Sequence, residues 1–444
     1  MSETKEKEFH DAPEKKVRQH KLDQEVKNNK KNKLIYVLEY LQQKYEFQFN
    51  LFAARTEYKQ KDNNEEFRFF DERAYNNMIM DIKLDAGIDV AETDFKSLIG
   101  SNRLSRNYDP IKEYLFSVPV WDETTDYIEN FLKQIQLLDE NQRPMLNKTF
   151  KKWFVMLVAS LIDDRVINDT CFVLSGKQGR GKTRFLETLV PRRLRFWYTY
   201  SGTFDPHDKD HKEMIGTKIQ IILDEMETLT RVEQGTLKTT MSAKTVGELR
   251  RAYGKERINL FRRASFCGSI NFDDFLTDPT GSRRWLPFSI YNIDVNEELN
   301  IDYLYAQALS LYKNNYQTWF DQSEIAELEK HNDQFRKLSP EEELLLIHFR
   351  KPTKEEKENG QYMLMPATLI MHDLASRDEY RKMNTNDTIA ARFGRLMVKL
   401  GYEFIQKRIS DSASPSKCYL VVRNDKITIE NELKPEKMQE EFPI

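Results

Sequence analysis

The segment GKQGRGKT constrains the fold of this chain more than any other feature of its sequence. It matches the phosphate-binding loop pattern G-x-x-x-x-G-K-[ST], in which glycines let backbone N–H groups wrap a polyphosphate. The apolar run Cys171–Ser175 precedes the loop, and the amphipathic stretch Arg184–Val190 follows it. This strand–loop–helix setting predicts an α/β core that binds a nucleoside triphosphate through Gly176, Lys177, Gln178, Gly179, Arg180, Gly181, Lys182 and Thr183.

The last two residues of the loop have separate expected roles. Lys182 would reach the β- and γ-phosphates of ATP, and the Thr183 hydroxyl would hold Mg²⁺. The positive end of the helix that follows would add to the attraction for phosphate. The alternative interpretation is a glycine-rich turn with a solvated lysine.

A carboxylate pair follows the second apolar run of the predicted core. The run Lys218–Leu223 ends directly in Asp224 and Glu225. A strand that delivers acidic residues at its C-terminal end meets the needs of Mg²⁺ coordination and water activation. We therefore expect Asp224 to support the Mg²⁺ shell and Glu225 to orient and deprotonate the attacking water. A strand end followed by a helix cap is the alternative.

An amide and two guanidinium groups would complete such a site. The strand expected at Ala264–Ile270 ends at Asn271, whose amide would contact the γ-phosphate or the lytic water. A residue that caps the next turn is the alternative. Arg283 and Arg284 follow a polar turn, and guanidinium groups stabilise charge on a transferring phosphoryl group, often from a neighbouring subunit. Ordinary surface arginines are the alternative for this pair.

The order of these motifs resembles the virulence-associated protein E family of mobile-element and phage proteins, relatives of the superfamily-three helicases. The resemblance covers residues 107–290. The segments that carry it are Tyr108–Leu115, Val120–Asp122, Leu174–Thr183, Asp208–His211, Ile222–Glu225, Leu249–Gly254, Gly268–Asn271 and Gly281–Pro287.

The resemblance implies an AAA+-like ATPase that assembles into a homo-oligomeric ring, a hexamer, in which Arg283 or Arg284 reaches the nucleotide of a neighbour. Asn271 would take the role called sensor 1. A hairpin between the acidic pair and the sensor strand would project into the pore of the ring and grip single-stranded DNA. The chemistry of the hairpin agrees, because its cations would bind phosphates and its tyrosine could stack on a base. The alternative is a solvated charged hairpin. The matching residues are Lys244, Arg250, Arg251, Tyr253 and Lys255.

The function expected from this resemblance is ATP-dependent translocation on DNA, or its unwinding, during replication of a mobile element or phage-type genome. Members of the wider group often carry a primase domain upstream, yet nothing before residue 100 resembles a polymerising site. A separate primase or another mobile-element replication protein is therefore an expected partner. Two alternatives stay open: a regulatory or defence NTPase switch that hydrolyses ATP without unwinding, and a DNA-binding initiator that ATP assembles.

Composition and periodicity divide the chain into an α/β P-loop core between an α-helical N-terminal region and a C-terminal winged-helix-like domain. The resemblance implies that this core is AAA+-like. The last helix of the N-terminal region is expected to run from Thr124 to Leu138. The expected parts are a disordered charged tail at 1–32, a mostly helical region at 33–150, the ATPase domain with a helical extension at 151–337, the winged-helix-like domain at 338–424 and a tail at 425–444.

The winged-helix-like domain is expected from three helices and a hairpin. Arg392, Arg395 and Lys399 on its third helix would face a nucleic-acid groove or phosphates, and a surface for protein contacts is the alternative. The expected elements are helices at 341–349, 367–375 and 386–400, a short strand at 362–365 and a hairpin formed by 402–408 and 417–422.

Two other groups of residues suggest sites but also have ordinary explanations. His207 and His211 lie four residues apart among aspartates, as in a metal site. No third set of ligands converges there by sequence, so a polar loop that caps a helix is the preferred interpretation. Phe261–Arg263 is either a basic nucleic-acid patch or a set of charges at the start of a strand.

The overall charge does not identify a partner, because 69 Lys and Arg residues against 72 Asp and Glu residues leave a net charge of -3. A nucleic-acid surface must therefore be a local basic patch. The 3 cysteines lie far apart without a C-x-x-C pair, which argues against a disulfide framework or zinc ribbon and favours a reducing compartment. Since no apolar stretch approaches the length of a membrane span, we expect a cytoplasmic protein without membrane partners.

Overall fold

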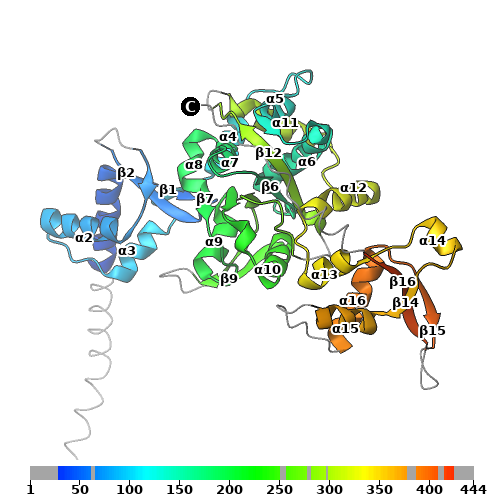
Figure 1. Ribbon diagram of the computed structural model, residues 1–444. Coiled ribbons are helices and arrows are strands. Elements are labelled where there is room, and N and C mark those ends of the chain that lie inside the picture. The colour runs from blue at the N-terminus through cyan, green and yellow to red at the C-terminus, as the bar shows by residue number, and fades with distance from the viewer. Residues whose placement is uncertain are drawn as a thin grey trace, which may run out of the picture. The chain divides into compact units, whose positions relative to one another are not determined.

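The computed structural model describes residues 29–61, 66–250, 257–277, 282–296, 299–377, 387–408 and 415–424. The chain is a mixed α/β protein that divides into two compact units, Met1–Phe335 and Arg336–Ile444 (Figure 1). Among the described residues, no helix combines the length and the apolar character needed to span a bilayer.

A six-stranded sheet forms the centre of the larger unit, with strand order β5-β12-β6-β11-β8-β7. The strands from β12 to β7 run parallel, whereas β5 pairs antiparallel with β12 at one edge. The strands predicted from apolar runs are confirmed as β6, β8 and β11, whereas β5, β7 and β12 were not predicted. The bounds are β5 (Ile135–Leu137), β6 (Cys171–Ser175), β7 (Thr199–Gly202), β8 (Gln220–Leu223), β11 (Ser265–Ile270) and β12 (Trp285–Ile293).

Helices cover both faces of this sheet. Successive side chains of a strand point to opposite faces, so they enter two separate buried clusters, one on each face. In β6, Phe172 and Leu174 pack with α6, α7, α8 and α11, whereas Cys171 and Val173 pack with α9 and α10 (Figure 1). The helices of this part are α4 (Pro110–Ser117), α5 (Tyr127–Leu132), α6 (Arg143–Ile162), α7 (Lys182–Thr188), α8 (Arg192–Tyr198), α9 (Lys209–Thr217), α10 (Arg231–Ser242), α11 (Ile301–Lys313) and α12 (Gln322–Asn332). Short 3₁₀ helices are η1 (Glu140–Gln142), η2 (Met226–Thr228), η3 (Ser282–Arg284) and η4 (Asp333–Phe335).

The N-terminal part contains helices, as expected for residues 33–150, and also a four-stranded sheet, which the expectation of a mostly helical region did not include. Its strand order is β3-β2-β1-β4, and it packs with a helix within residues 29–44 and with α2 and α3. Aromatic residues at alternating positions, such as Tyr45 and Phe47, suit a half-buried strand better than a helix. The bounds are β1 (Tyr45–Asn50), β2 (Arg55–Gln60), β3 (Arg68–Phe69), α2 (Glu72–Ala86), α3 (Glu92–Ile99) and β4 (Ser105–Tyr108).

The helix expected from Thr124 to Leu138 is also corrected, because α5 ends at Leu132. The next residues form β5, which pairs with β12 through Leu137 and Ile290. The Arg143 guanidinium donates hydrogen bonds to the carbonyls of Leu132 at 3.1 Å and Ile135 at 2.6 Å. Since the strand partner is distant in sequence, local periodicity does not reveal this edge strand.

The smaller unit contains the helices and the hairpin expected in its part of the chain, with a further strand and a short helix. Its core includes Leu345, Phe349, Leu374, Phe393 and Tyr419. The sheet order is β13-β16-β14, and β15 pairs with β16. The bounds are α13 (Pro340–His348), β13 (Phe349–Arg350), α14 (Lys354–Glu358), β14 (Met363–Pro366), α15 (Ala367–Arg377), α16 (Asp387–Lys399), β15 (Phe404–Lys407) and β16 (Ser416–Arg423).

Candidate nucleotide-binding site

The glycine-rich loop joins the end of β6 to the start of α7, and its backbone fits tightly against the end of β12. A Cβ atom at Gly176 would lie 2.7 Å from the Ile290 carbonyl oxygen, which only glycine avoids. Gly181 has φ 80° and lies at the N-cap of α7, a conformation that side chains rarely adopt. The loop between them contains Lys177, Gln178, Gly179 and Arg180, as the sequence pattern predicts.

Lys182 is folded back onto this loop and is only 6% exposed. Its Nζ donates to the carbonyl oxygens of Gly176 and Lys177, the latter at 3.0 Å, and to Asn271 Oδ1 at 3.3 Å. Burial lowers the pKa of Lys182, while the nearby Glu227 carboxylate acts in the opposite direction. The ammonium group therefore lies where phosphate oxygens would replace loop carbonyls as its acceptors.

Oxygen atoms from four elements meet beside Thr183. Asp224 Oδ1 accepts hydrogen bonds from Thr183 Oγ1 at 3.4 Å and Ser269 Oγ at 3.2 Å, and Asp224 Oδ2 accepts from Ser201 Oγ at 2.9 Å. Ser201 and Ser269 were not predicted as site residues. Both lie near the C-terminal ends of β7 and β11, the two parallel strands that pair with β8. Such a set of hydroxyl and carboxylate oxygens fits Mg²⁺.

The donor set also explains why Mg²⁺ would need the nucleotide. Among the described residues, no group of three or more His, Cys, Asp or Glu side chains could hold a metal by itself. Mg²⁺ commonly binds through one or two carboxylates with substrate phosphates and waters. Thr183 and Asp224 therefore fit a cation that arrives with a polyphosphate.

The structure separates the two glutamates that follow Asp224. Glu225 is exposed, has φ 54°, and its side chain forms no hydrogen bond or ion pair with the described residues. Glu227, which was not predicted as a site residue, instead accepts hydrogen bonds through Oε1 from Asn271 Nδ2 at 2.8 Å and from the Asn271 backbone N–H at 3.4 Å. Its Oε2 atom is buried and has no partner among the described residues.

The 3₁₀ turn η2 explains this arrangement. Glu225 caps the turn in the left-handed region, and the turn (Met226–Thr228) brings Glu227 beside Asn271, while Glu225 lies exposed. Asn271 thus lies between Lys182 and Glu227, with its carbonyl oxygen toward the ammonium group and its amide toward the carboxylate. The sequence did contain a signal for Glu227, because Asp224 and Glu227 are two carboxylates three residues apart directly after β8.

Comparison with known proteins identifies the family. The sequence profile of the virulence-associated protein E-like domain matches residues 115–337, about half of the chain. This chain belongs to the virulence-associated protein E family. The family assignment made from the motif order is therefore confirmed, and the matched residues include the loop, Asp224, Asn271 and the arginine pair.

Solved structures resemble this virulence-associated E protein only distantly. An apo structure of the NrS-1 C-terminal region (305–718) is 12% identical with a TM-score of 0.44, and the alignment covers 88% of this chain and 99% of that one. An A-form apo structure of the same NrS-1 region is 13% identical with a TM-score of 0.42, covering 85% and 96% of the two chains. No curated protein sequence matches this family member.

In this virulence-associated E protein, the arginine pair lies in the turn η3. Arg284 Nε donates to Ser242 Oγ at the end of α10, at 3.0 Å, whereas Arg283 is exposed and forms no ion pair or hydrogen bond with the described residues. The buried Asn332 at the end of α12 holds the turn from both sides, since its Nδ2 donates to the carbonyls of Ser282 at 2.8 Å and Trp285 at 3.0 Å. The two arginines therefore have different surroundings.

The expected DNA-contacting hairpin is present as β9 (Thr245–Arg250) and β10 (Arg257–Phe261), which pair antiparallel. Lys244 lies exposed at its base. The side chain of Arg250 and all of Arg251, Tyr253 and Lys255 lie outside the described residues, so their role as a DNA-binding tip stays a prediction.

The other suggested sites have structural explanations in the described part of the chain. Arg262 is 1% exposed and donates to the Asn168 carbonyl at 2.6 Å, and Arg263 pairs with Asp164 at 3.2 Å, so neither extends into solvent as a basic patch. Asp208 caps α9, and His211 Nδ1 accepts a hydrogen bond from the Asp205 backbone N–H at 3.0 Å. The capping interpretation of the histidine segment therefore agrees with the structure.

Proposed function

We propose that this protein is a Mg²⁺–ATP-dependent ATPase with an AAA+-like core. The observation that carries the proposal is the convergence of Lys182, Thr183, Asp224 and Asn271 on one edge of a parallel sheet, around a loop that only glycines can form. The strand order β12-β6-β11-β8-β7 supports it, because the loop follows β6, the acidic pair follows β8 and the asparagine follows the strand between them.

Each residue has a role in the proposed hydrolysis. Lys182 and the loop N–H groups bind the β- and γ-phosphates, and Thr183 and Asp224 would hold Mg²⁺, which would supply positive charge beside the phosphates. Asn271, positioned by Glu227, orients a water toward the γ-phosphate. For this step the exposed side chain of Glu225 turns toward the bound nucleotide, and it accepts the proton of this water as the water oxygen bonds to phosphorus and the bond to the leaving ADP oxygen breaks. Arg283 of a neighbouring copy stabilises the transferring phosphoryl group.

We further propose that copies assemble into a homo-oligomeric ring, a hexamer, which translocates on or unwinds DNA during replication of a mobile element or phage-type genome. The family assignment supports this proposal. The hairpin β9–β10 also supports it, because it lies in the chain between β8, which precedes Asp224, and β11, which precedes Asn271. Single-stranded DNA in the pore, a separate primase as partner and a winged-helix-like C-terminal unit are parts of the same proposal.

The rate of ATP hydrolysis with and without DNA tests this function. We expect single-stranded DNA to stimulate phosphate release by the full-length protein, and a forked duplex to be separated in a reaction that requires ATP and Mg²⁺. Hydrolysis that DNA does not change would instead favour a regulatory or defence switch. DNA-stimulated hydrolysis without strand separation would favour an initiator that ATP assembles on DNA.

Loss of Glu227 is expected to impair hydrolysis through Asn271. Glu227→Ala should lower kcat about 10- to 100-fold, the loss typical when a hydrogen-bonded partner of a site residue is removed. Glu227→Gln should retain more activity, because its amide oxygen still accepts a hydrogen bond from Asn271. The measurement is phosphate release at saturating ATP, with nucleotide affinity determined separately.

A double-mutant cycle distinguishes this role from a general structural one. If Glu227 acts through Asn271, the variant with both Asn271→Ala and Glu227→Ala should be hardly slower than Asn271→Ala alone. Losses that multiply in the double variant would contradict the proposed coupling.

A further inference from the structure

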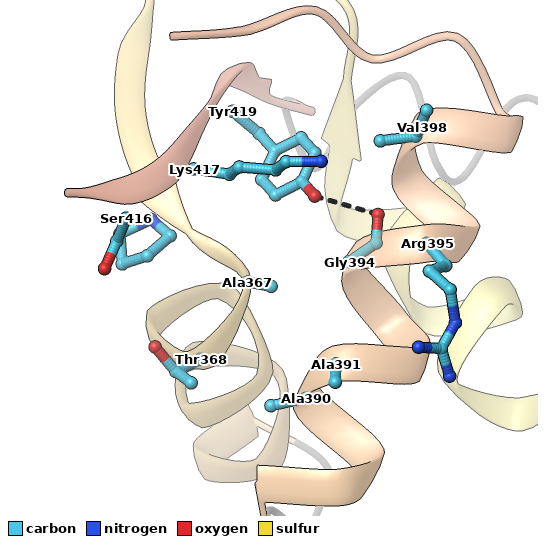
Figure 2. A pocket seen from close by; sticks show the side chains of 11 residues that line it. Ala367, Thr368, Ala390, Ala391, Gly394, Arg395, Val398, Ser416, Lys417 and Tyr419 are labelled. Atoms are coloured by element: carbon cyan, nitrogen blue, oxygen red, sulfur yellow. Dashed lines mark hydrogen bonds between the residues drawn. The ribbon is translucent and has the colours of Figure 1, made fainter. Parts of the chain in front are cut away.

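The smaller unit contains a groove that the proposed ATPase chemistry does not use. It lies between the start of α15, α16 and the start of β16, and has a volume of about 480 Å³ (Figure 2). Small residues line its floor, including Ala367, Ala390 and Gly394. A Cβ atom at Gly394 would be tightly placed, 3.0 Å from the Tyr419 hydroxyl, which donates a hydrogen bond to the Gly394 carbonyl at 2.8 Å.

The rim of the groove is cationic. Lys417 reaches from β16 toward α16, and Arg395 projects from the side of α16 turned away from α15 in this view (Figure 2). Both side chains are exposed, and neither forms an ion pair with any described residue. Among the described residues that line the groove, none is acidic.

Further cations extend this surface. Arg392 is exposed one turn before Arg395 on α16, and Lys407 and Arg408 are exposed at the end of β15. Four other cations of the same unit are paired with carboxylates, in Arg336–Glu342, Arg350–Glu356, Lys357–Glu403 and Arg423–Asp373. On a chain whose net charge is -3, such a local surface favours a polyanionic partner.

The kind of polyanion follows from what the groove lacks. Proteins that hold single strands stack bases on exposed aromatic rings. The aromatic residue of this groove, Tyr419, is 2% exposed and its hydroxyl is engaged, and the nearby ring of Phe404 lies under the Lys417 ammonium group at 4.4 Å. The groove therefore suits a sugar–phosphate backbone better than unstacked bases.

We propose that this groove and the outer face of α16 bind the backbone of double-stranded DNA. Arg392 and Arg395 lie three residues apart on one face of a helix, and the major groove of B-form DNA is wide enough for a helix, unlike that of an RNA duplex. The small side chains of the floor let a backbone approach closely, while Lys417 and Arg395 neutralise its phosphates. The inference goes beyond the proposed ATPase, because it requires neither nucleotide nor assembly.

The test is duplex binding by the full-length protein without nucleotide, measured by fluorescence anisotropy over a range of salt concentrations. The variant Arg395→Gln/Lys417→Gln is compared with Arg350→Gln/Lys357→Gln, which removes the same charge from paired positions of the same unit. Loss of two phosphate contacts should reduce the salt slope by about 1.8 and weaken binding on the order of 50-fold at 0.1 M salt. The control variant should bind like the wild type.

Further arms of the experiment decide between partners. Affinity for the matching single strand and basal ATP hydrolysis should be unaffected in the groove variant, and an RNA duplex should bind the wild type more weakly than the DNA duplex. Equal losses in both variants, loss of single-strand binding alone, or an RNA duplex that binds as tightly would overturn the proposal. So would unchanged duplex binding, the result expected if an acidic protein occupies the groove. If the wild type shows no ATPase activity but the groove variant still loses duplex binding, only the proposed ATPase function is refuted.

Discussion

Replacing Lys182 with alanine is expected to lower the rate of ATP hydrolysis by about 10²–10³-fold, the usual cost of removing one donor to developing transition-state charge. Lys182 is buried between loop carbonyls and Asn271. Among the described residues, no other cation forms a hydrogen bond with the Asn271 side chain, so none could replace the lost ammonium group. The variant should also bind ATP more weakly, because the ammonium group contacts the phosphates in the ground state as well.

Phosphate release and nucleotide affinity, measured on the same preparation, check this prediction. Lys313→Ala serves as the matched control, since Lys313 is an exposed lysine in the last turn of α11, outside the site. Alanine favours helices, so the Lys182 variant should keep the overall fold, and an unchanged circular dichroism spectrum would check this. Hydrolysis at the wild-type rate by Lys182→Ala would show that the loop does not bind the reacting phosphates.

The parts of the site that sequence could predict depend on local patterns. The loop, Asp224 and Asn271 each follow an apolar run that forms a parallel strand, and parallel strands bring their C-terminal ends to one edge. The same reasoning explains why β6, β8 and β11 were predicted correctly. Buried parallel strands are continuous apolar segments, whatever their partners are.

The parts that sequence did not predict depend on distant partners. The edge strand β5 exists because β12 lies beside it, and β1 because it pairs with β2 and β4. The position of Glu227 depends on one 3₁₀ turn, and Glu225 lies exposed at the N-cap of that turn although it adjoins Asp224. Likewise, only the contacts of the turn η3 distinguish Arg283 from Arg284, because the sequence presents them as equivalent neighbours.

Arg283→Ala is expected to lower hydrolysis by the assembled protein about 10³-fold or more, the usual contribution of an arginine supplied to a phosphoryl group by a neighbouring subunit. Arg284→Ala should have a much smaller effect, because Arg284 is engaged by Ser242 within its own chain. ATP binding to the Arg283 variant should be nearly unchanged, since Lys182 and Thr183 of its own subunit are intact. Phosphate release and sedimentation of the assembled protein provide the two measurements.

Mixing two inactive variants tests whether Arg283 acts across an interface. Lys182→Ala lacks a functional loop but keeps its arginine, and Arg283→Ala keeps its loop but lacks the arginine. In a ring of randomly mixed subunits, about a quarter of the interfaces would combine an intact loop with an intact arginine, so activity should reappear on mixing. No recovery, in subunits shown to exchange, would place Arg283 in its own subunit's site or outside the reaction. A protomer that hydrolyses ATP at full rate at every concentration would exclude the shared site altogether.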